Sequence, residues 1–167
     1  MRPEYHVWTK LEVRFRDLDP LGHVNKSVYV SYFEVARVAY MRALAQRIKR
    51  DDHPAALNPS VLEFWSLSGA EWVIARAIVD YRSPIYIDDT VHSAARVTAV
   101  SRHSFTFGYE VRTGDSFEEG RLAAEGSSVQ VFYDPKTKQV RLRPDWFLPA
   151  VSMLEGRPEN TFDLDSA

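Results

Sequence analysis

The sequence VRFRDLDPLGHVNKSVYVSYFEVAR, residues 13–37, joins a polar strand end and a tight turn to a long apolar helix. Pro20 and Gly22 supply turn chemistry, and Asn25 can cap a helix that we expect to continue to about Lys49. The polar side chains of the turn therefore lie at a helix N-terminus. Such an end carries unsatisfied N–H groups and a partial positive charge, which favour an anion or a developing oxyanion.

The predicted helix has a wider apolar face than a surface helix usually has. Two adjacent rows form this face: Tyr29, Phe33, Ala36, Tyr40 and Leu44, and beside them Val28, Tyr32, Val35, Ala39 and Ala43. A helix this apolar must be covered on most sides. Because the chain has one such helix and much strand-like sequence after it, we expect an α+β fold, with an antiparallel sheet wrapped around one long central α-helix.

Patterns of alternating and β-branched residues predict the strands, and proline, glycine and acidic turns separate them. The predicted strands are residues 7–16, 61–67, 71–82, 90–100, 104–112, 121–133 and 139–142, the later ones forming a meander, with a loop at residues 50–60. A short helix follows Pro144, and Pro149 limits its length. We find no linker or repeat, so we expect one domain over residues 1–156 and a mobile polar tail over residues 157–167.

Composition narrows the class of protein. The chain has 167 residues, 45% of them hydrophobic, enough for one substantial core, and its net charge of −2 gives no general attraction to nucleic acid or an anionic membrane. It has no cysteine, no signal-peptide-like start and no long apolar segment, so we expect a cytoplasmic protein without disulfides. Motifs such as G-x-G-x-x-G, G-x-S-x-G and H-E-x-x-H are missing, so we expect neither a metal nor a redox cofactor.

Two segments resemble one known family. DLDPLGHVNKSVYVSYFEVAR, residues 17–37, resembles the signature of hotdog-fold acyl-CoA thioesterases of the 4-hydroxybenzoyl-CoA thioesterase type. IVDYRSPIYIDDTVHSAARV, residues 78–97, is similar to a second block of that family, and the similarity covers about residues 8–142. The resemblance implies a hotdog fold, thioester hydrolysis with coenzyme A as part of the substrate, and a homodimer or a dimer of dimers with active sites at the subunit interface.

The resemblance also implies site residues. The catalytic carboxylate of the family falls on Asp19, as nucleophile or general base, and the oxyanion donor falls on the backbone N–H of about Lys26. His23 matches a catalytic histidine of plant acyl-carrier-protein thioesterases. Those enzymes also use an asparagine where this chain has Leu21, so their full set of catalytic residues is absent.

In the bacterial aroyl-CoA enzymes of the family that this sequence resembles, a basic loop between two central strands holds the phosphates of coenzyme A. Arg102 and His103 occupy the corresponding turn, and Arg82, beside a Ser-Pro turn, is a third candidate for phosphate contact. For all three residues the ordinary alternative is a solvated turn side chain.

Structural roles also remain open for Asp19 and for neighbouring polar residues. Asp19 can simply complement the helix dipole, a contribution of about 0.3–1 kcal/mol, while Asp17 is expected to order the turn. Glu34 and Arg37 can form an ordinary pair on the helix surface, or Glu34 can support the site. The rival function is a non-catalytic hotdog protein that binds acyl-CoA as a sensor or scaffold; the helix start of a hotdog hydratase is not matched.

Overall fold

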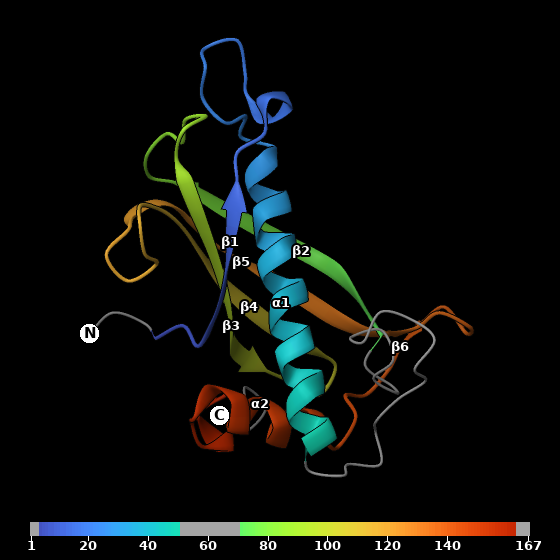
Figure 1. Cartoon of the computed structure of the whole chain (residues 1–167). Helices are drawn as coiled ribbons and strands as arrows, with labels where there is room; N and C mark the ends of the chain where they lie inside the picture. Colours follow the sequence, from blue (N-terminus) through green and yellow to red (C-terminus); the bar gives the residue numbers. More distant parts are fainter. Residues whose placement is uncertain (1–3, 51–70, 163–167) are drawn as a thin grey trace. The chain divides into compact units, whose positions relative to one another are not determined.

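The computed structural model describes residues 4–50 and 71–162. Its elements are β1 (Val7–Glu12), a 3-10 turn (Phe15–Asp17), α1 (Val28–Arg50), β2 (Trp72–Tyr81), β3 (Thr90–Val100), β4 (Ser104–Thr113), β5 (Arg121–Asp134), β6 (Gln139–Val140), α2 (Phe147–Glu155) and a second 3-10 turn (Glu159–Thr161) (Figure 1). Among the described residues, neither helix combines the length and the apolar character that crossing a membrane requires.

The strands form one sheet in the order β1-β3-β4-β5-β2, with β6 paired to β5. β1 runs antiparallel to β3, with Val7 opposite Ala95 and Glu12 opposite Thr90. The expected α+β class, an antiparallel sheet with one long helix, is confirmed. The expected meander holds only from β3 to β5, because β2 precedes β3 in the chain but pairs with β5. In the described part of the chain, β1 and β2 are therefore the edge strands at the two ends of the order β1-β3-β4-β5-β2.

Several predicted boundaries move for local reasons. The first strand ends at Glu12 rather than at residue 16, because the 3-10 turn Phe15–Asp17 follows it. The last helix begins at Phe147 and carries Pro149 in its first turn, where a backbone N–H needs no partner within the helix. The predicted strand at residues 61–67 lies outside the described residues, as does the predicted loop beyond residue 50.

Contacts within the chain group its residues into two compact units. Unit 1 comprises residues 1–40, 78–96 and 108–127, and unit 2 comprises residues 41–77, 97–107 and 128–167. Strands β2 to β5 contribute residues to both units. The earlier expectation of one domain over residues 1–156 stays a prediction.

In unit 1 the first half of α1 packs closely on the sheet. The ring of Phe33 stacks on Tyr109, with ring centroids 4.5 Å apart and planes inclined by 10°. Gly126 of β5 permits this approach, because a Cβ atom there would lie 2.6 Å from the Phe33 ring and closer still to the carbonyl oxygen of Ile78. No side chain fits at that position without movement of its neighbours.

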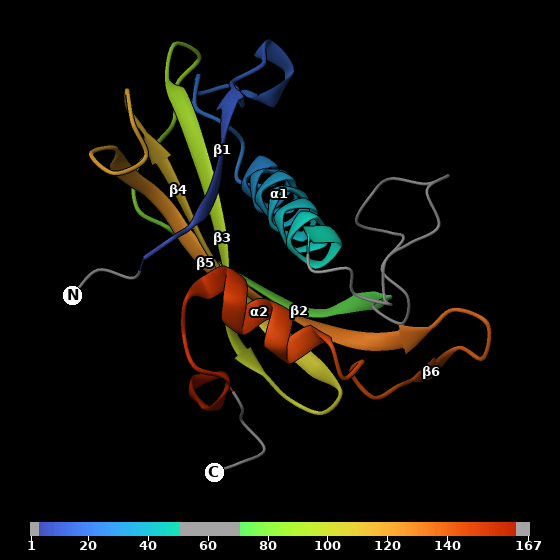
Figure 2. The same ribbon diagram turned by 60° about the horizontal axis from the view of Figure 1, so that its bottom comes forward.

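Unit 2 has an aromatic core, which we call the aromatic cluster: Trp72, Phe105, Phe107, Phe132 and Phe147. Phe105 is at its centre, with ring centroids 4.7 Å from Phe147, 5.2 Å from Phe132 and 5.5 Å from Phe107. Phe147 belongs to α2, the short helix drawn in red in Figure 2, and its ring contacts bring this helix into the core. The cluster thus joins β4, β5 and α2 through apolar contacts.

Residues 157–162, the first part of the predicted mobile tail, include a 3-10 turn and a buried aromatic residue. The 3-10 turn Glu159–Thr161 is followed by Phe162, which is buried and whose carbonyl accepts a hydrogen bond from the Val100 amide at 2.8 Å. The guanidinium of Arg157 lies 4.3 Å from the centroid of the Phe162 ring. A single buried aromatic residue thus anchors a segment whose composition is otherwise polar. The rest of the predicted tail, residues 163–167, lies outside the described residues.

Candidate active site

Asp17 holds the turn that precedes α1. The residue is only 3% exposed. Its Oδ2 accepts hydrogen bonds from the Arg14 backbone N–H at 2.9 Å and from Arg14 Nε at 3.1 Å, while Oδ1 accepts from Nη2 at 3.0 Å. Burial raises the pKa of the Asp17 carboxyl, but the hydrogen bonds from Arg14 outweigh it and hold this pKa below its usual value. Asp17 therefore orders the turn, as expected.

Asp19, two residues later, is half-buried and only partly satisfied. Its Oδ1 accepts from the Leu21 amide at 2.9 Å and from the His23 amide at 3.3 Å. Gly22, at φ 80°, lets the chain turn back so that the Asp19 amide donates to the His23 carbonyl at 2.7 Å. Among the described residues, nothing donates a hydrogen bond to Oδ2. One carboxylate oxygen is thus anchored, and the other is open to a substrate or water.

Near the start of α1, one backbone N–H is left open. The Asn25 side chain caps this end: Oδ1 accepts from the Ser27 amide at 2.9 Å, and the Asn25 carbonyl accepts from the Val28 amide at 2.9 Å. The amides of Val24 and Asn25 also have backbone acceptors. Within the described chain the Lys26 N–H has no acceptor, which makes it the available donor between residues 24 and 28.

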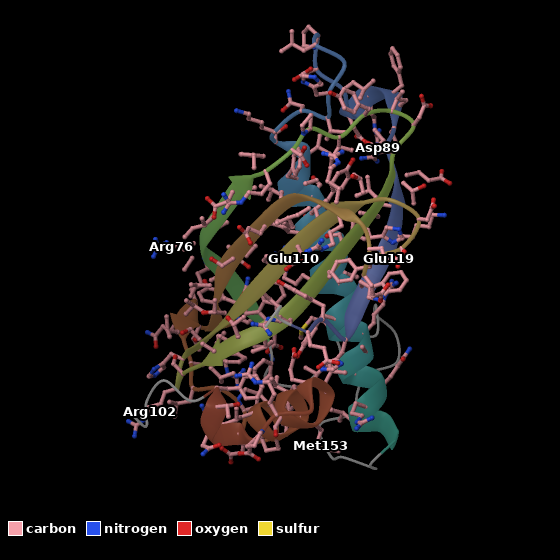
Figure 3. All side chains as sticks on the ribbon, turned by 90° about the vertical axis from the view of Figure 1, so that its left-hand side faces the viewer. Arg76, Asp89, Arg102, Glu110, Glu119 and Met153 are labelled. Carbon is pink, nitrogen blue, oxygen red and sulfur yellow. The ribbon has the colours of Figure 1, made fainter. Side chains whose placement is uncertain are left out.

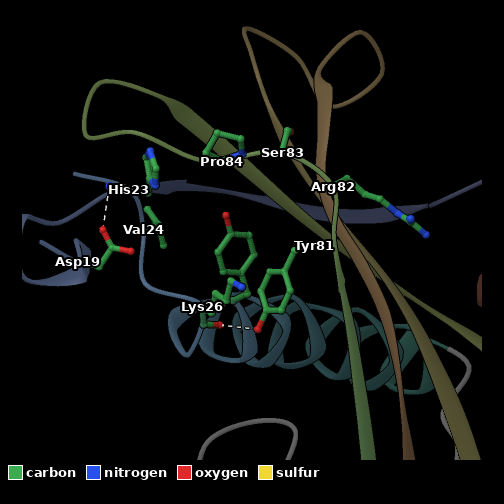
Figure 4. A pocket seen from close by; sticks show the side chains of 9 residues that line it. Asp19, His23, Val24, Lys26, Tyr81, Arg82, Ser83 and Pro84 are labelled. Atoms are coloured by element: carbon green, nitrogen blue, oxygen red, sulfur yellow. Dashed lines mark hydrogen bonds between the residues drawn. The ribbon is translucent and has the colours of Figure 1, made fainter. Parts of the chain in front are cut away.

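A pocket of about 270 Å³ lies beside this turn (Figure 4). It brings together four of the residues singled out from the sequence, Asp19, His23, Lys26 and Arg82, although Arg82 comes from a distant segment. The full lining is Asp19, His23, Val24, Lys26, Tyr29, Tyr81, Arg82, Ser83 and Pro84. The lining thus combines a carboxylate residue, the residue with the open backbone N–H, and apolar or aromatic side chains in one place.

Tyr81 is a pocket residue that the sequence reasoning placed only on a strand face. Its hydroxyl donates to the Lys26 carbonyl at 2.9 Å (Figure 4), and its ring meets Tyr29 edge-on with centroids 5.1 Å apart. The Lys26 ammonium lies 5.4 Å from the centroid of the Tyr81 ring. Tyr29 is buried as expected of a core residue, but it also lines the pocket. The signal for Tyr81 was its place at the end of β2, one residue before the Ser-Pro turn.

His23 contacts Asp19 through its backbone. Its imidazole packs edge-on against Tyr86, with ring centroids 5.2 Å apart, and makes no hydrogen bond to the Asp19 carboxylate in the described structure. The ring lines the pocket. A catalytic role for His23 stays a prediction.

The three candidate phosphate contacts fall in two places. Arg82 lines the pocket, and its Nε donates to Glu125 Oε1 at 2.8 Å, so a carboxylate already balances this guanidinium. Arg102 and His103 lie in unit 2, in the turn between β3 and β4, and both are exposed; Figure 3 shows Arg102 pointing outward. The Arg102 carbonyl accepts from the Arg143 amide at 2.8 Å, which fixes the backbone of this turn.

Glu34 forms a helix-surface pair and does not line the pocket. Its exposed carboxylate lies 3.4 Å from the buried guanidinium of Arg37, which also donates to the Tyr109 hydroxyl at 3.3 Å. Nor do the described residues include a group of three or more His, Asp or Glu side chains placed to hold a metal ion.

Comparison with known proteins connects this site to a family. Residues 13–151 match the Thioesterase-like superfamily. A thioesterase from Thermus thermophilus, solved in complex with coenzyme A and zinc, is similar to this chain with 33% identity and a TM-score of 0.72, covering 95% of this chain and 99% of that one. A putative esterase of Aquifex aeolicus is 30% identical over 99 residues, which are 59% of this chain and 66% of that protein.

A more distant structure supports the fold alone. DHNA-CoA thioesterase from Staphylococcus aureus shares 22% identity, with a TM-score of 0.63 over 90% of this chain and 88% of that one. The resemblance to hotdog thioesterases seen in the sequence is thereby confirmed, and the family match includes the turn, α1 and the end of β2 that form the pocket. The chain belongs to the thioesterase-like superfamily.

Proposed function

We propose that the protein hydrolyses the thioester of an acyl-CoA to a free acid and coenzyme A. The observation that supports this most directly is the pairing in one pocket of an Asp19 oxygen without a hydrogen-bond donor and a Lys26 N–H without an acceptor, both counted over the described residues. Thioester hydrolysis requires a nucleophile or base and an oxyanion donor. The family match and the coenzyme A bound to the Thermus neighbour favour this substrate class.

The proposed chemistry begins at Asp19 Oδ2. It either attacks the thioester carbonyl, forming a mixed anhydride that water then hydrolyses, or it takes a proton from a water molecule that attacks the same carbon. The Lys26 N–H donates to the oxygen that becomes negative. When the tetrahedral intermediate collapses, the C–S bond breaks and coenzyme A leaves as a thiolate. Because a thiol has a pKa of about 8.5, this departure needs no strong acid.

The two ends of the substrate require different surroundings. We place the acyl group in the pocket, against the Tyr29 and Tyr81 rings. Arg102 and His103 stay candidates for contact with the nucleotide phosphates. Arg82 stays a candidate for phosphate contact, although Glu125 competes for its guanidinium. His23 stays a candidate catalytic residue, with its imidazole on the pocket wall.

We also propose a homodimer or a dimer of dimers, formed through β2. This edge strand exposes apolar side chains along its length: Val73 and Ile74 are each 44% exposed and Ile78 is 38% exposed. Antiparallel pairing of two β2 strands centred on Ile78 would set Arg76 of each opposite Asp80 of the other, a favourable charge pair. The partner strand would then run beside the Tyr81 end of β2, next to the pocket.

The subunit arrangement is testable at Ile78. Ile78→Asp should convert the assembly to monomers in analytical ultracentrifugation and lower activity in parallel, because two negative charges would face each other at the centre of the paired strands. Val140→Asp is the control, since this valine is exposed on β6. A monomeric wild type with full activity would contradict the proposed assembly.

Thiol release from a panel of aliphatic and aromatic acyl-CoAs tests the activity itself. We expect turnover of at least one class, read by a thiol reagent. Saturable acyl-CoA binding without release of free coenzyme A would instead support the rival sensor or scaffold.

A further inference from the structure

We propose that Tyr81 is a positioning residue for this reaction: its hydroxyl holds the Lys26 carbonyl and thereby aims the Lys26 N–H at the oxyanion. The inference rests on the proposed thioester hydrolysis and extends it to a residue in another element, at the end of β2. Tyr81 need not touch the reacting atoms, since its hydroxyl acts on the backbone behind them.

Two successive peptide groups flank Lys26, and three of their four polar atoms are held. In the first group, the Asn25 carbonyl accepts from the Val28 amide at 2.9 Å. In the second, the Ser27 amide donates to Asn25 Oδ1 at 2.9 Å, and the Lys26 carbonyl accepts from Tyr81 at 2.9 Å. The fourth atom is the Lys26 N–H. Tyr81 thus supplies the anchor on the carbonyl of the residue whose own N–H is open.

Its neighbours hold the Tyr81 ring in place. Tyr29, which is buried, meets the ring at 88° with centroids 5.1 Å apart, and the Lys26 ammonium lies 5.4 Å from the Tyr81 centroid. These two contacts favour the ring orientation in which the hydroxyl reaches the Lys26 carbonyl. The Asn25 cap is local, whereas the Tyr81 bond joins residues 55 positions apart and ties the helix start to the sheet.

The anchor matters more in the transition state than in the ground state. A hydrogen bond weakens steeply once its angle falls below about 120°, so rotation of the Lys26 backbone would spoil donation to the oxyanion. The ground-state carbonyl carries less charge and depends less on that donor. Loss of the Tyr81 hydroxyl should therefore lower kcat and leave KM nearly unchanged.

Tyr81→Phe tests the inference, because it removes the hydroxyl and keeps the ring. We expect kcat for an acyl-CoA to fall about tenfold, the size of one lost hydrogen bond, with KM within about twofold of the wild type. Tyr133→Phe is the matched control, since the Tyr133 hydroxyl makes no hydrogen bond to the described residues, and both kinetic constants should be kept. Melting temperatures of the two variants should agree within about 4 °C, the shift of one weak interaction.

These measurements distinguish a wrong role for Tyr81 from a wrong proposed function. An active wild type and an equally active Tyr81→Phe variant would overturn the inference alone. A variant that fails to fold, or one that loses kcat and gains KM together with a large fall in melting temperature, would also overturn it, because the hydroxyl would then be structural. Absence of thiol release by the wild type would overturn the proposed function and the role of Tyr81 with it.

Discussion

The turn before α1 and the aromatic cluster of unit 2 differ in whether their groups have interaction partners. In the turn, Asp19 keeps one oxygen open and Lys26 an open N–H, counted over the described residues. In the aromatic cluster, Phe105 is 1% exposed and surrounded by other aromatic rings. A buried polar group without a hydrogen-bond partner destabilises the folded state, whereas buried apolar contacts stabilise it. The difference indicates that stability and chemistry depend on separate residues, which substitutions can test.

Phe105→Ala should have the largest effect in free energy. Truncation at the centre of the aromatic cluster leaves a cavity, so the free energy of unfolding should fall by about 3–5 kcal/mol in chemical denaturation. Phe15→Ala is the control: this phenylalanine is 86% exposed, and its loss should change stability by no more than about 0.5 kcal/mol. Similar losses for the two variants would remove the distinction between the aromatic cluster and the turn.

Asp19→Asn should show the reverse pattern. The side chain keeps its size and one carbonyl oxygen, so folding and assembly should be unchanged, while the nucleophile or base is lost. We expect kcat to fall at least about 10²-fold in a thiol-release assay. Affinity for acyl-CoA, measured by calorimetry, should be kept or improved, since the carboxylate contributes little to ground-state binding. A folded variant with near wild-type kcat would leave the family match supporting the fold alone.

Asp17→Asn should separate the two acidic residues of the turn. It removes charge-assisted hydrogen bonds with Arg14, so the free energy of unfolding should fall by about 1–3 kcal/mol at neutral pH, with far more turnover left than in Asp19→Asn.

The direction of the Asp17 pKa shift determines how the contribution of this residue to stability depends on pH. Since the folded pKa of Asp17 is lowered, its contribution is complete above the unfolded pKa of about 3.9 and disappears as the pH falls through the folded value. The stability difference between wild type and Asp17→Asn should therefore shrink below about pH 4. A difference that stays constant down to the acid transition would contradict this role.

Arg102→Ala should have the smallest effect. Arg102 is exposed, and we propose it as a phosphate contact, so its loss should raise KM for coenzyme A esters by about fivefold and leave kcat nearly unchanged. A pantetheine thioester, which lacks the nucleotide, serves as the control and should be hydrolysed equally well by both proteins. Equal losses with both substrates would make Arg102 a structural residue of its turn.

Local patterns in the sequence predicted the elements well where each pattern is complete in itself. Turn-forming residues precede and follow residues 90–100 in the sequence, and β3 has those bounds in the structure. The turn motif at Asp19 predicted a carboxylate at a helix start, and the structure places it there. Pairing between distant segments was not predictable in the same way, because alternation shows which face a strand buries and not which strand lies beside it. β2 therefore appeared as part of a meander rather than as the neighbour of β5.

Contacts across long sequence separations explain what was missed in the site. The bond from Tyr81 to Lys26 and the pairing of Arg82 with Glu125 join segments that share no local pattern. A tyrosine on an alternating strand looks the same whether its hydroxyl meets water or a backbone carbonyl. The fold could thus be read from periodicity and the candidate catalytic carboxylate from the family motif, but the support of the helix start could not.

The close packing at Gly126 also affects how variants of this protein could accept other substrates. Because a methyl group there would meet both the Phe33 ring and the Ile78 carbonyl, any larger residue must move the Phe33 ring and separate the backbones of β5 and β2. A shift of β2 changes the spacing between the helix start and Tyr81, and with it the room in the pocket where we propose that the acyl group binds. Substrate size can therefore respond to a position outside the pocket lining, and a search for variants that accept bulkier acyl groups has reason to include residue 126.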